Sequence, residues 1–316
     1  MGWGGSENGN MNFLVIADPI RNLKPRTDTS LALVREALLR THSVHWCTGE
    51  DLFLWEGRVF ARVEEITGCA ENSHPATETV SEAQALNSYD GIWIRKDPPF
   101  DVSYMSLCWL LALEENNVPM VNKPSLLLRF HEKLLPLEAM EKGYLSPEEV
   151  IPSFLPTGRR IPVPGDFPKG ECVSKPWLGH GGKEVKKLES PRTPDPYFFL
   201  QPLQKEITRT GDRRIFFLNG EIIGSFTRMP AEGDIRSNIA AGGHGVLSEM
   251  TKKQVEIANR LGDFLKEIGI AFAGADMIGD KISEVNITSP TGFQTYHEIG
   301  GRRLAPLFMN FVEELV

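Results

Sequence analysis

A continuous apolar run near the start of the chain, residues 12–17 with the sequence NFLVIA, sets the strongest limit on the fold. Such a run is typical of a strand buried on both faces of a parallel sheet. Asp18-Pro19 ends it, and residues 28–40 then begin with capping residues and continue at helical spacing. Residues 42–47 are typical of a second strand. This strand–helix–strand order predicts a doubly wound α/β domain.

A later segment, residues 91–100 with the sequence GIWIRKDPPF, is expected to be a strand with a charged end. Ligands of open α/β sheets sit at the carboxyl ends of the strands, so these charged groups are candidates for ligand binding. A charged loop stiffened by two prolines is the alternative. With a helix expected over 103–116 and a strand over 118–122, Lys123-Pro124 closes a first domain of residues 11–123.

Composition excludes several classes of protein. The chain has 316 residues and a net charge of −8, which argues against general binding of nucleic acid. No apolar run reaches the roughly 20 residues that cross a bilayer, and residues 1–10 lack the features of a signal peptide, so they are expected to be a disordered lead-in or an expression remnant. The spacing of the four cysteines suggests neither a zinc site nor disulfides, which fits a reducing cytoplasm; they are Cys47, Cys69, Cys108 and Cys172.

The rest of the chain mixes strands, helices and glycine-rich loops. We expect a helix over 126–142 that carries Lys133, loops over the proline-rich residues 152–168, and a strand, glycine-rich loop and strand over 171–188. Further expected elements are a strand over 197–203, a hairpin over 212–228 that turns at Asn219-Gly220, a mobile loop over 236–245 and a helix over 251–268.

The final hairpin, expected over residues 270–290, carries three oxygen-bearing side chains: Asp276, Glu284 and Asn286. Mg²⁺ takes oxygen ligands and needs few carboxylates, because phosphates and waters complete its octahedron. Glu284 and Asn286 share a face of their strand, and Asp276 joins them only if it pairs with Glu284. That pairing implies a three-residue tip, Gly279-Asp280-Lys281, whereas a two-residue turn pairs Asp276 with Ser283. A metal site and an ordinary surface hairpin both stay open.

Other residues suit phosphates and carboxylates, although each has an ordinary explanation. Gly179, Gly181 and Gly182 lie between two expected strands, where backbone N–H groups could cover phosphates; a plain glycine-rich turn is the alternative. Lys133 and Lys175 could face phosphates or be solvated. Arginines suit planar recognition of carboxylates and phosphates, but surface charge explains any one of Arg214, Arg228 and Arg236. His180 and His244 lie in glycine loops, where exposure is the default.

Together these pieces resemble the ATP-grasp ligases, and over residues 11–316 they are similar to the bacterial glutathione synthetases. The matching strings are colinear: Ala17-Asp-Pro-Ile20, residues 94–100, Val121-Asn-Lys-Pro124, Glu132-Lys-Leu134, Lys175-Pro176 with the glycine loop, Gly211-Asp-x-Arg214, Asn238-x-Ala-Ala-Gly-Gly243 and Glu284-x-Asn-x-Thr-Ser-Pro-Thr291. The resemblance implies an N-terminal α/β substrate-binding domain (11–123), a central lid subdomain (124–204) and a C-terminal ATP-grasp domain with the metal and acceptor site (205–316).

Residue by residue, the resemblance implies the following roles. Lys133 and Lys175 match phosphate-binding lysines, Gly179, Gly181 and Gly182 match the phosphate flap, residues Gln201, Pro202, Leu203 and Gln204 match the adenine hinge, and Asp212 matches a residue near the ribose. Asp276, Glu284 and Asn286 match the ligands of Mg²⁺, or of Mn²⁺ in its place. Arg214, Arg236 and Asn238 match the acceptor side of the cleft, and residues 236–245 match a lid.

The implied reaction is an ATP-dependent joining of a carboxylate to an amine through an acyl-phosphate, with γ-glutamylcysteine and glycine as the expected substrates. His244 and residues 292–301 depart from the family pattern, and the hinge is one residue longer before Asp212, so the resemblance bears more on ATP and Mg²⁺ than on the acid and the amine. The alternatives are another ATP-grasp peptide or amino-acid ligase, such as a glutamate ligase, and a non-catalytic nucleotide-binding protein. The resemblance also implies a homo-oligomer, a dimer or tetramer.

Overall fold

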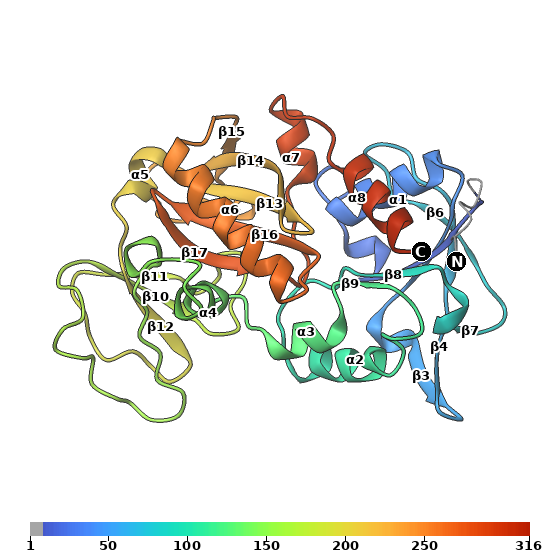
Figure 1. Ribbon diagram of the computed structural model, residues 1–316, viewed down its shortest axis with the longest axis horizontal. Coiled ribbons are helices and arrows are strands. Elements are labelled where there is room, and N and C mark those ends of the chain that lie inside the picture. Colours follow the sequence, from blue (N-terminus) through green and yellow to red (C-terminus); the bar gives the residue numbers. More distant parts are fainter. Residues whose placement is uncertain (1–8) are drawn as a thin grey trace.

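The computed structural model describes residues 9–316, so most of the expected lead-in, residues 1–8, lies outside the described residues. The N-terminal part is built on a mixed six-stranded sheet (Figure 1). Its strands, in spatial order, are β6 (Ala76–Thr79), β5 (Glu64–Gly68), β2 (Ser43–Cys47), β1 (Asn12–Ile16), β8 (Gly91–Ile94) and β9 (Met120–Val121). The four strands from β2 to β9 are parallel, which confirms the predicted α/β domain.

Strand β1 is buried on both faces, as its apolar run predicts. Leu14 and Ile16 belong to one hydrophobic core, whereas Phe13 and Val15 belong to a second core on the opposite face. Helix α1 (Thr29–Leu39) begins at Asp28, whose carboxylate accepts the Leu31 N–H at 3.0 Å. Helix α2 (Val102–Ala112) begins at Asp101 and is shorter than predicted.

Residues 69–88, a polar stretch, contribute two short strands to the N-terminal part. β6 extends the main sheet, and β7 (Gln84–Ala85) joins β4 (Arg58–Ala61) and β3 (Leu52–Trp55) in a small antiparallel sheet. These strands are short and polar, and strong alternation of apolar and polar residues is absent from them, which explains why their sequence gave no clear strand pattern.

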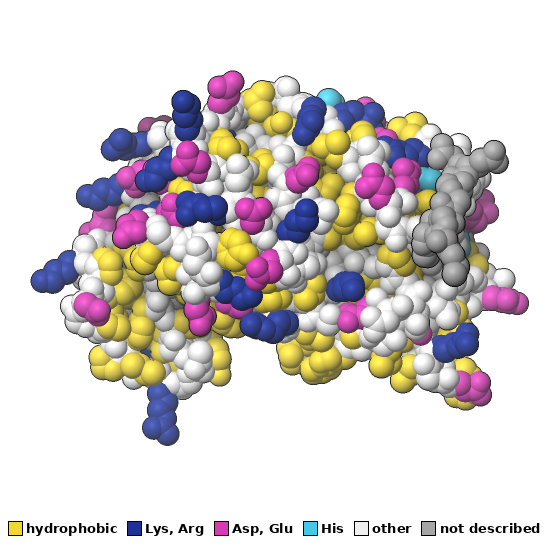
Figure 2. All heavy atoms as spheres, viewed as in Figure 1, with side chains coloured by type: hydrophobic (Ala, Val, Ile, Leu, Met, Phe, Trp, Pro, Cys, Tyr) yellow, Lys and Arg dark blue, Asp and Glu magenta, His cyan; other side chains and the backbone are white. Residues whose placement is uncertain are grey.

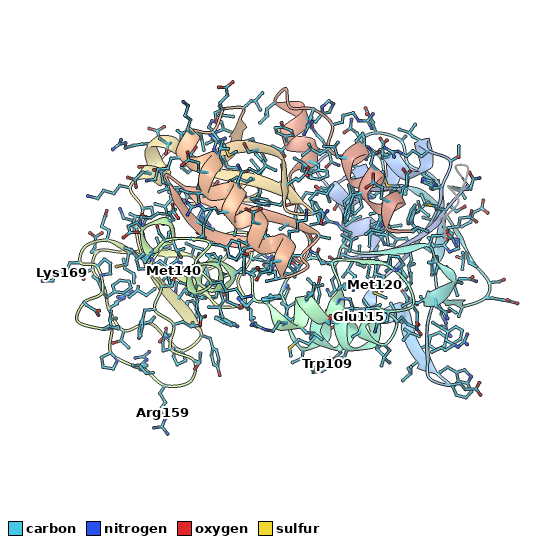
Figure 3. The ribbon with its side chains drawn as sticks, in the orientation of Figure 1. Trp109, Glu115, Met120, Met140, Arg159 and Lys169 are labelled. Atoms are coloured by element: carbon cyan, nitrogen blue, oxygen red, sulfur yellow. The ribbon has the colours of Figure 1, made fainter. Side chains whose placement is uncertain are left out.

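The central part is a three-stranded antiparallel sheet of β11 (Lys186–Leu188), β10 (Cys172–Pro176) and β12 (Phe198–Pro202). The proline-rich residues 152–168 contain neither helix nor strand, as predicted. The buried core of this sheet is small: Cys172, Leu188 and Leu200. Figure 3 shows Arg159 and Lys169 projecting from its long loops.

The C-terminal part holds a five-stranded antiparallel sheet with the order β15 (His244–Val246), β14 (Glu221–Met229), β13 (Asp212–Leu218), β16 (Phe272–Ile278) and β17 (Lys281–Asn286). Asn219 and Gly220 turn between β13 and β14 with φ values of 50° and 82°, the conformation that a tight hairpin turn requires. Helix α6 (Lys252–Glu267) packs beside this sheet, and α8 (Ala305–Leu315) returns to lie against α1 of the N-terminal part (Figure 1).

Two predictions about elements were wrong. The single helix expected over 126–142 is two helices, α3 (Pro124–Arg129) and α4 (Leu135–Glu141), because Pro136 fits only in the first turn of a new helix. Lys133 therefore lies in the break between them. The loop expected over 236–245 ends in strand β15, which pairs with β14 because Gly243 allows a close approach to the Ser237 carbonyl.

No helix among residues 9–316 is both long enough and apolar enough to cross a membrane. All four cysteines lie within the described residues and are free thiols.

Candidate active site

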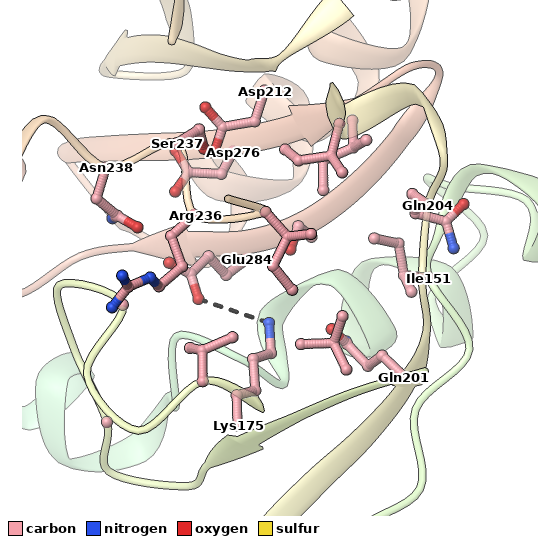
Figure 4. A pocket seen from close by; sticks show the side chains of 18 of the residues that line it. Ile151, Lys175, Gln201, Gln204, Asp212, Arg236, Ser237, Asn238, Asp276 and Glu284 are labelled. Carbon is pink, nitrogen blue, oxygen red and sulfur yellow. Dashed lines mark ion pairs between the residues drawn. The ribbon is translucent and has the colours of Figure 1, made fainter. Parts of the chain in front are cut away.

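A pocket lies between the three-stranded and five-stranded sheets, where side chains of both sheets meet (Figure 4). Fourteen of the sixteen predicted site residues line it: Lys133, Lys175, Gly179, Gly181, Gly182, Gln201, Pro202, Leu203, Gln204, Asp212, Arg236, Asn238, Asp276 and Glu284. The other two, Arg214 and Asn286, lie beside it without lining it. Residues from five separate stretches of the chain thus meet in one cavity.

The final hairpin has the predicted pairing but not the predicted turn. Asp276 pairs with Glu284 across β16 and β17, as the metal hypothesis requires. The three-residue tip was wrong, because Ile278 pairs with Lys281 and leaves a two-residue turn at Gly279-Asp280. A β-bulge reconciles the two: Ser283 is an extra residue between the pairs, and it restores Glu284 to the face of Asp276. The bulge therefore places both carboxylates on the pocket side.

Asp276 is held by two arginines. Its Oδ1 accepts the Nε–H of Arg214 at 2.6 Å, and its Oδ2 accepts one N–H from Arg214 at 3.2 Å and one from Arg228 at 2.8 Å. Burial raises the pKa of this carboxyl group, but the two guanidinium groups outweigh burial and lower the pKa to about 2. Asp276 is therefore ionised at neutral pH. Three of about four lone-pair positions are occupied, which leaves one for a ligand.

Arg228 also forms a two-pronged pair with Asp212, at 2.7 and 2.6 Å. Asp212, Arg228, Asp276 and Arg214 thus form a buried quartet of two acids and two arginines across β14, β13 and β16. Arg214 additionally donates to the Thr291 carbonyl at 3.1 Å. The predicted acceptor-side residue Arg214 therefore lies behind Asp276 and holds it, which fixes the carboxylate toward the pocket.

Glu284 is more open than Asp276. Its side chain is 24% exposed, and its ion-pair partner is Lys175, whose Nζ lies at 3.9 Å (Figure 4). Asn286 donates its amide N–H to the Gly274 carbonyl at 3.2 Å, which leaves its side-chain oxygen as an acceptor. Two carboxylates and one amide oxygen are hard donors that suit Mg²⁺. Residues 9–316 hold no group of three or more His, Cys, Asp or Glu side chains arranged for a metal, so a cation here needs other oxygens, such as phosphates.

The two lysines approach the pocket from different elements. Lys175 comes from the end of β10; burial lowers the pKa of its ammonium group and the nearby Glu284 opposes that shift. Lys133 comes from the break between α3 and α4, and its ammonium donates to the Gly179 carbonyl at 2.7 Å. Lys133 thereby ties down the glycine flap, residues 179–183, and keeps further N–H donors for a ligand.

The loop of residues 231–243, which holds most of the predicted lid 236–245 and is called the lid loop below, meets the glycine flap over the pocket. Arg236 pairs with Asp234 within this loop, with the closest contact at 2.7 Å. Gly182 has φ of +74°, and a Cβ there would lie 3.0 Å from Oδ1 of Asn238. Glycine is therefore required at this contact for both its conformation and its size. The loop is ordered against the flap by this contact.

Sequence reasoning missed several lining residues. Ile151, Val173, Val185, Ile207 and Ile278 give the pocket an apolar wall beside the hinge residues 201–204. In the sequence each of them has the pattern of an ordinary core residue. Their common position on the pocket wall is visible only in the folded structure. His180 was expected to be exposed, and this was wrong: it is half-buried and lines the pocket. His244 is exposed, as expected.

The fold and this pocket define the chain as an ATP-grasp ligase. The structure is similar to that of D-cycloserine synthetase DcsG, with a TM-score of 0.61 at 12% identity over 95% of this chain and 99% of that chain. It is also similar to the ATP-grasp ligase PsnB complexed with minimal precursor, Mg and ADP, with a TM-score of 0.55 at 13% identity over 96% and 97% of the two chains. At such identities the likeness establishes the fold.

Sequence comparison supplies the family. Residues 11–128 match the prokaryotic glutathione synthetase N-terminal domain, and residues 168–300 match the prokaryotic glutathione synthetase ATP-grasp domain. The glutathione synthetase of Mesorhizobium japonicum is 33% identical over 96% of this chain and 98% of its own length. That of Prochlorococcus marinus is 31% identical over 97% of this chain and 100% of its own length. The chain belongs to the prokaryotic glutathione synthetase family.

Proposed function

We propose that the chain joins γ-glutamylcysteine to glycine, with conversion of ATP to ADP and phosphate and with Mg²⁺ as the cation. The observation that supports this most strongly is the pairing of Asp276 with Glu284 on the pocket wall, beside Lys133, Lys175 and the glycine flap. Carboxylates at this position are suited to a cation, and ammonium groups and backbone N–H groups to the phosphates.

The adenine would lie in the apolar slot beside the hinge. Pro202 has no N–H, and the Leu203 N–H already donates to the Glu171 carbonyl at 2.9 Å. Two hinge positions thus offer no free backbone donor. The Gln204 side chain donates to the Pro202 carbonyl at 2.9 Å and keeps its own oxygen as an acceptor for the adenine amino group.

Asp276, Glu284 and Asn286 would hold Mg²⁺, or Mn²⁺ in its place. When bound, the cation neutralises charge that develops on the transferred phosphoryl group. Without it the three carboxylates of the wall are already matched by basic groups, because the quartet contains two acids and two arginines and Glu284 faces Lys175. A bare divalent cation would upset that balance, so we expect it to enter together with the ATP phosphates.

The chain's own residues contribute positioning and charge rather than covalent chemistry. The carboxylate of the first substrate attacks the γ-phosphorus of ATP. This forms an acyl-phosphate as the bond from the γ-phosphorus to ADP breaks. Lys133, Lys175 and the flap stabilise the phosphoryl oxygens in this step. The amine then attacks the acyl carbon, and phosphate leaves. The lid loop, with Arg236 and Asn238, would exclude water that would otherwise hydrolyse the acyl-phosphate.

One feature favours a second candidate, an ATP-grasp peptide or amino-acid ligase that joins another acid and amine. The segment after Pro290, at the acceptor edge, forms helix α7 (Phe293–Glu298) and packs by its rings: Phe293 lies edge-on to Phe216 at 5.1 Å, and Tyr296 lies 6.3 Å from Phe226. Glycine offers no apolar group for such surroundings, whereas a larger amine would.

An ADP-release screen over pairs of acids and amines separates these candidates. We expect ADP and glutathione with γ-glutamylcysteine and glycine in the presence of Mg²⁺. ADP release only with a different pair selects the second candidate. Nucleotide binding without ADP release from any pair would reject the ligase proposal in favour of a non-catalytic protein.

We also propose a homo-oligomer, a dimer or tetramer, in a reducing cytoplasm, which suits the four free thiols. Helix α2 and the residue that follows it support the first part, because they expose large apolar side chains: Val102 is 73%, Trp109 56% and Leu113 54% exposed. Figure 3 shows Trp109 pointing outward, and Figure 2 shows apolar atoms gathered over this part of the surface. Sedimentation of a monomer at micromolar concentration would contradict the oligomer.

A further inference from the structure

His180 has no role in the chemistry described so far. It lies in the glycine flap between Gly179 and Gly181, and it lines the pocket together with Lys133, Lys175 and Glu284. The flap around it is fixed at both ends. Lys133 bonds the Gly179 carbonyl, and Gly182 packs against Asn238 of the lid loop. The imidazole is therefore carried on a held segment at the phosphate end of the pocket.

Three charged groups lie near enough to His180 to affect its protonation, each from a different element. Lys183 lies on the flap itself, Lys133 lies in the break between α3 and α4, and Asp97 follows β8 of the N-terminal sheet. Burial lowers the pKa of His180 and Lys183 adds to this, whereas Asp97 opposes it. The net shift is downward, so the imidazole is neutral at pH 7 and can accept a proton.

Asp97 relates His180 to the end of the N-terminal sheet where ligands of such folds bind. The parallel strands run in the order β2-β1-β8-β9, so the strand order reverses between β1 and β8. Ligands of such sheets bind at the carboxyl ends of the strands at this reversal. Asp97 stands there, and its N–H donates to Asp18, which follows β1, at 2.9 Å. His180 thus lies where the phosphate pocket meets the substrate crevice.

The other titratable groups on the pocket wall are already engaged. Asp212 and Asp276 are paired with arginines, and Glu284 faces Lys175 and the cation position. Lys133, Lys175 and Lys183 are suited to the phosphates, and Arg236 pairs with Asp234. Among the residues of the described chain that line the pocket, His180 is the one imidazole. An amine that attacks must lose a proton, so it needs a nearby proton acceptor that is not already engaged.

We propose that His180 is the general base that takes a proton from the attacking amine in the second half-reaction. This rests on the proposed function. An ammonium ion cannot attack because its nitrogen has no lone pair. Transfer of one proton to the imidazole frees the pair, which forms the C–N bond as the C–O bond to phosphate breaks. The imidazolium then releases its proton to solvent, and the nitrogen gives its second proton to the departing phosphate as the amide forms.

The test compares two amines in the variant His180→Gln. Glycine needs a base, whereas hydroxylamine is largely unprotonated at neutral pH and attacks acyl-phosphates without one. With glycine at pH 7, we expect the rate of ADP release to fall about 100-fold, the lower end of the range for general bases. With hydroxylamine, ADP release and hydroxamate formation should stay near the wild-type rate. The glycine rate of the variant should recover as the pH rises toward the pKa of the glycine ammonium.

Other outcomes overturn the proposal. An equal loss with both amines would place His180 in the ATP step, and an unchanged rate with glycine at pH 7 would remove it from catalysis. A shift in melting temperature on addition of ATP shows that the variant still folds and binds nucleotide. His74→Gln, an exposed histidine of the N-terminal part, is the matched control. If the wild type releases no ADP with γ-glutamylcysteine and either amine, the substrate assignment fails instead, and the same comparison is made with the pair that the screen selects.

Discussion

The carboxylate of Asp276 accepts hydrogen bonds from two buried arginines and still faces the pocket. Lys175 and Glu284, which lie 3.9 Å apart, complete the polar wall opposite the flap. At the scale of single residues the site therefore consists of pairs of opposite charge. Each pair keeps one partner available to a ligand.

Lys175→Ala removes one of these charges from the phosphate position. We expect ATP affinity to fall roughly 10- to 100-fold, the cost of one charge-assisted hydrogen bond. Calorimetric titration with a non-hydrolysable ATP analogue measures it. Lys187→Ala on the neighbouring strand β11 is the control, because Lys187 pairs with Glu171 away from the pocket wall. Unchanged affinity in Lys175→Ala would remove this lysine from the phosphate site.

Glu284→Gln keeps the shape of the side chain and removes its charge. We expect turnover to fall by at least about 100-fold, because a ligand of the cation is weakened. Melting temperature should stay within a few degrees, since Glu284 is partly exposed and its ion-pair partner Lys175 lies no closer than 3.9 Å. Glu256→Gln, on the exposed side of α6, is the control. Near-normal turnover at low Mg²⁺ would exclude Glu284 from the metal site.

The residues that sequence could predict are those with distinctive chemistry. The colinear strings pointed to fourteen residues that line the pocket, and eight of these are lysines, glycines or acids. The apolar slot could not be predicted, because in the sequence Ile151 and Ile207 cannot be distinguished from isoleucines of the hydrophobic core. His180 was missed for a different reason: a glycine-rich neighbourhood suggests exposure, and only the contact between flap and lid shows otherwise.

At the scale of elements, the flap is anchored by stacked rings. His131, in the break between α3 and α4, lies 3.9 Å from Trp177, whose ring stacks on Phe199 of β12 at 5.5 Å. The His131 Nδ1 accepts the Lys133 N–H at 3.2 Å. Trp177 follows β10 directly, so the stack joins the Lys133 segment to the root of the flap.

This stack gives stability a pH dependence. Burial, together with Lys133, lowers the pKa of His131 to about 4, so the unfolded chain binds more protons than the folded chain between pH 6.5 and 4. Stability is lost as the pH falls through that window. Between pH 7 and pH 4.5, the free energy of unfolding of the wild type should fall by about 3 kcal/mol more than that of His131→Phe, which keeps an aromatic ring but does not titrate. Melting curves of both proteins at pH 7 and pH 4.5 measure the difference, and parallel losses would contradict it.

Long periodic elements and the Asn219-Gly220 turn were predictable, because local chemistry decides them. The break after α3 and the bulge at Ser283 were not fully predictable. Pro136 offered a signal for the break that a continuous apolar pattern outweighed. Ser283 gives no sequence signal for the bulge. The bulge serves to bring neighbouring side chains to the pocket face, and the residue type at the bulge itself does not mark it.

At the scale of the whole molecule, the N-terminal and C-terminal parts share their cores. One core joins Leu14 of β1 to Phe264 of α6, and the other joins Val15 of β1 to Phe272 of β16. The central sheet has its own small core. We therefore expect the central sheet to move as a lid against a body formed by the other two parts.

Buried Asn122 of the N-terminal part links the two parts of that body to each other. Its amide donates to the carbonyls of Phe272 and Ile287, at 2.6 and 2.7 Å, and its oxygen accepts the Phe272 N–H at 2.8 Å. Asn122→Ala should lower the free energy of unfolding by about 2–5 kcal/mol, because three buried polar groups lose their partner. The exposed neighbour Asn116→Ala should change it little. Equal melting temperatures for the two variants would show that the junction does not depend on Asn122.

The central claim is that the pocket activates a carboxylate by transfer of phosphoryl from ATP. Turnover with γ-glutamylcysteine labelled with ¹⁸O in the glycyl-accepting carboxylate tests it most directly, with mass spectrometry of the released phosphate. An acyl-phosphate route predicts that each phosphate carries one ¹⁸O atom from the carboxylate. Phosphate free of the label, formed together with the peptide, would contradict the account.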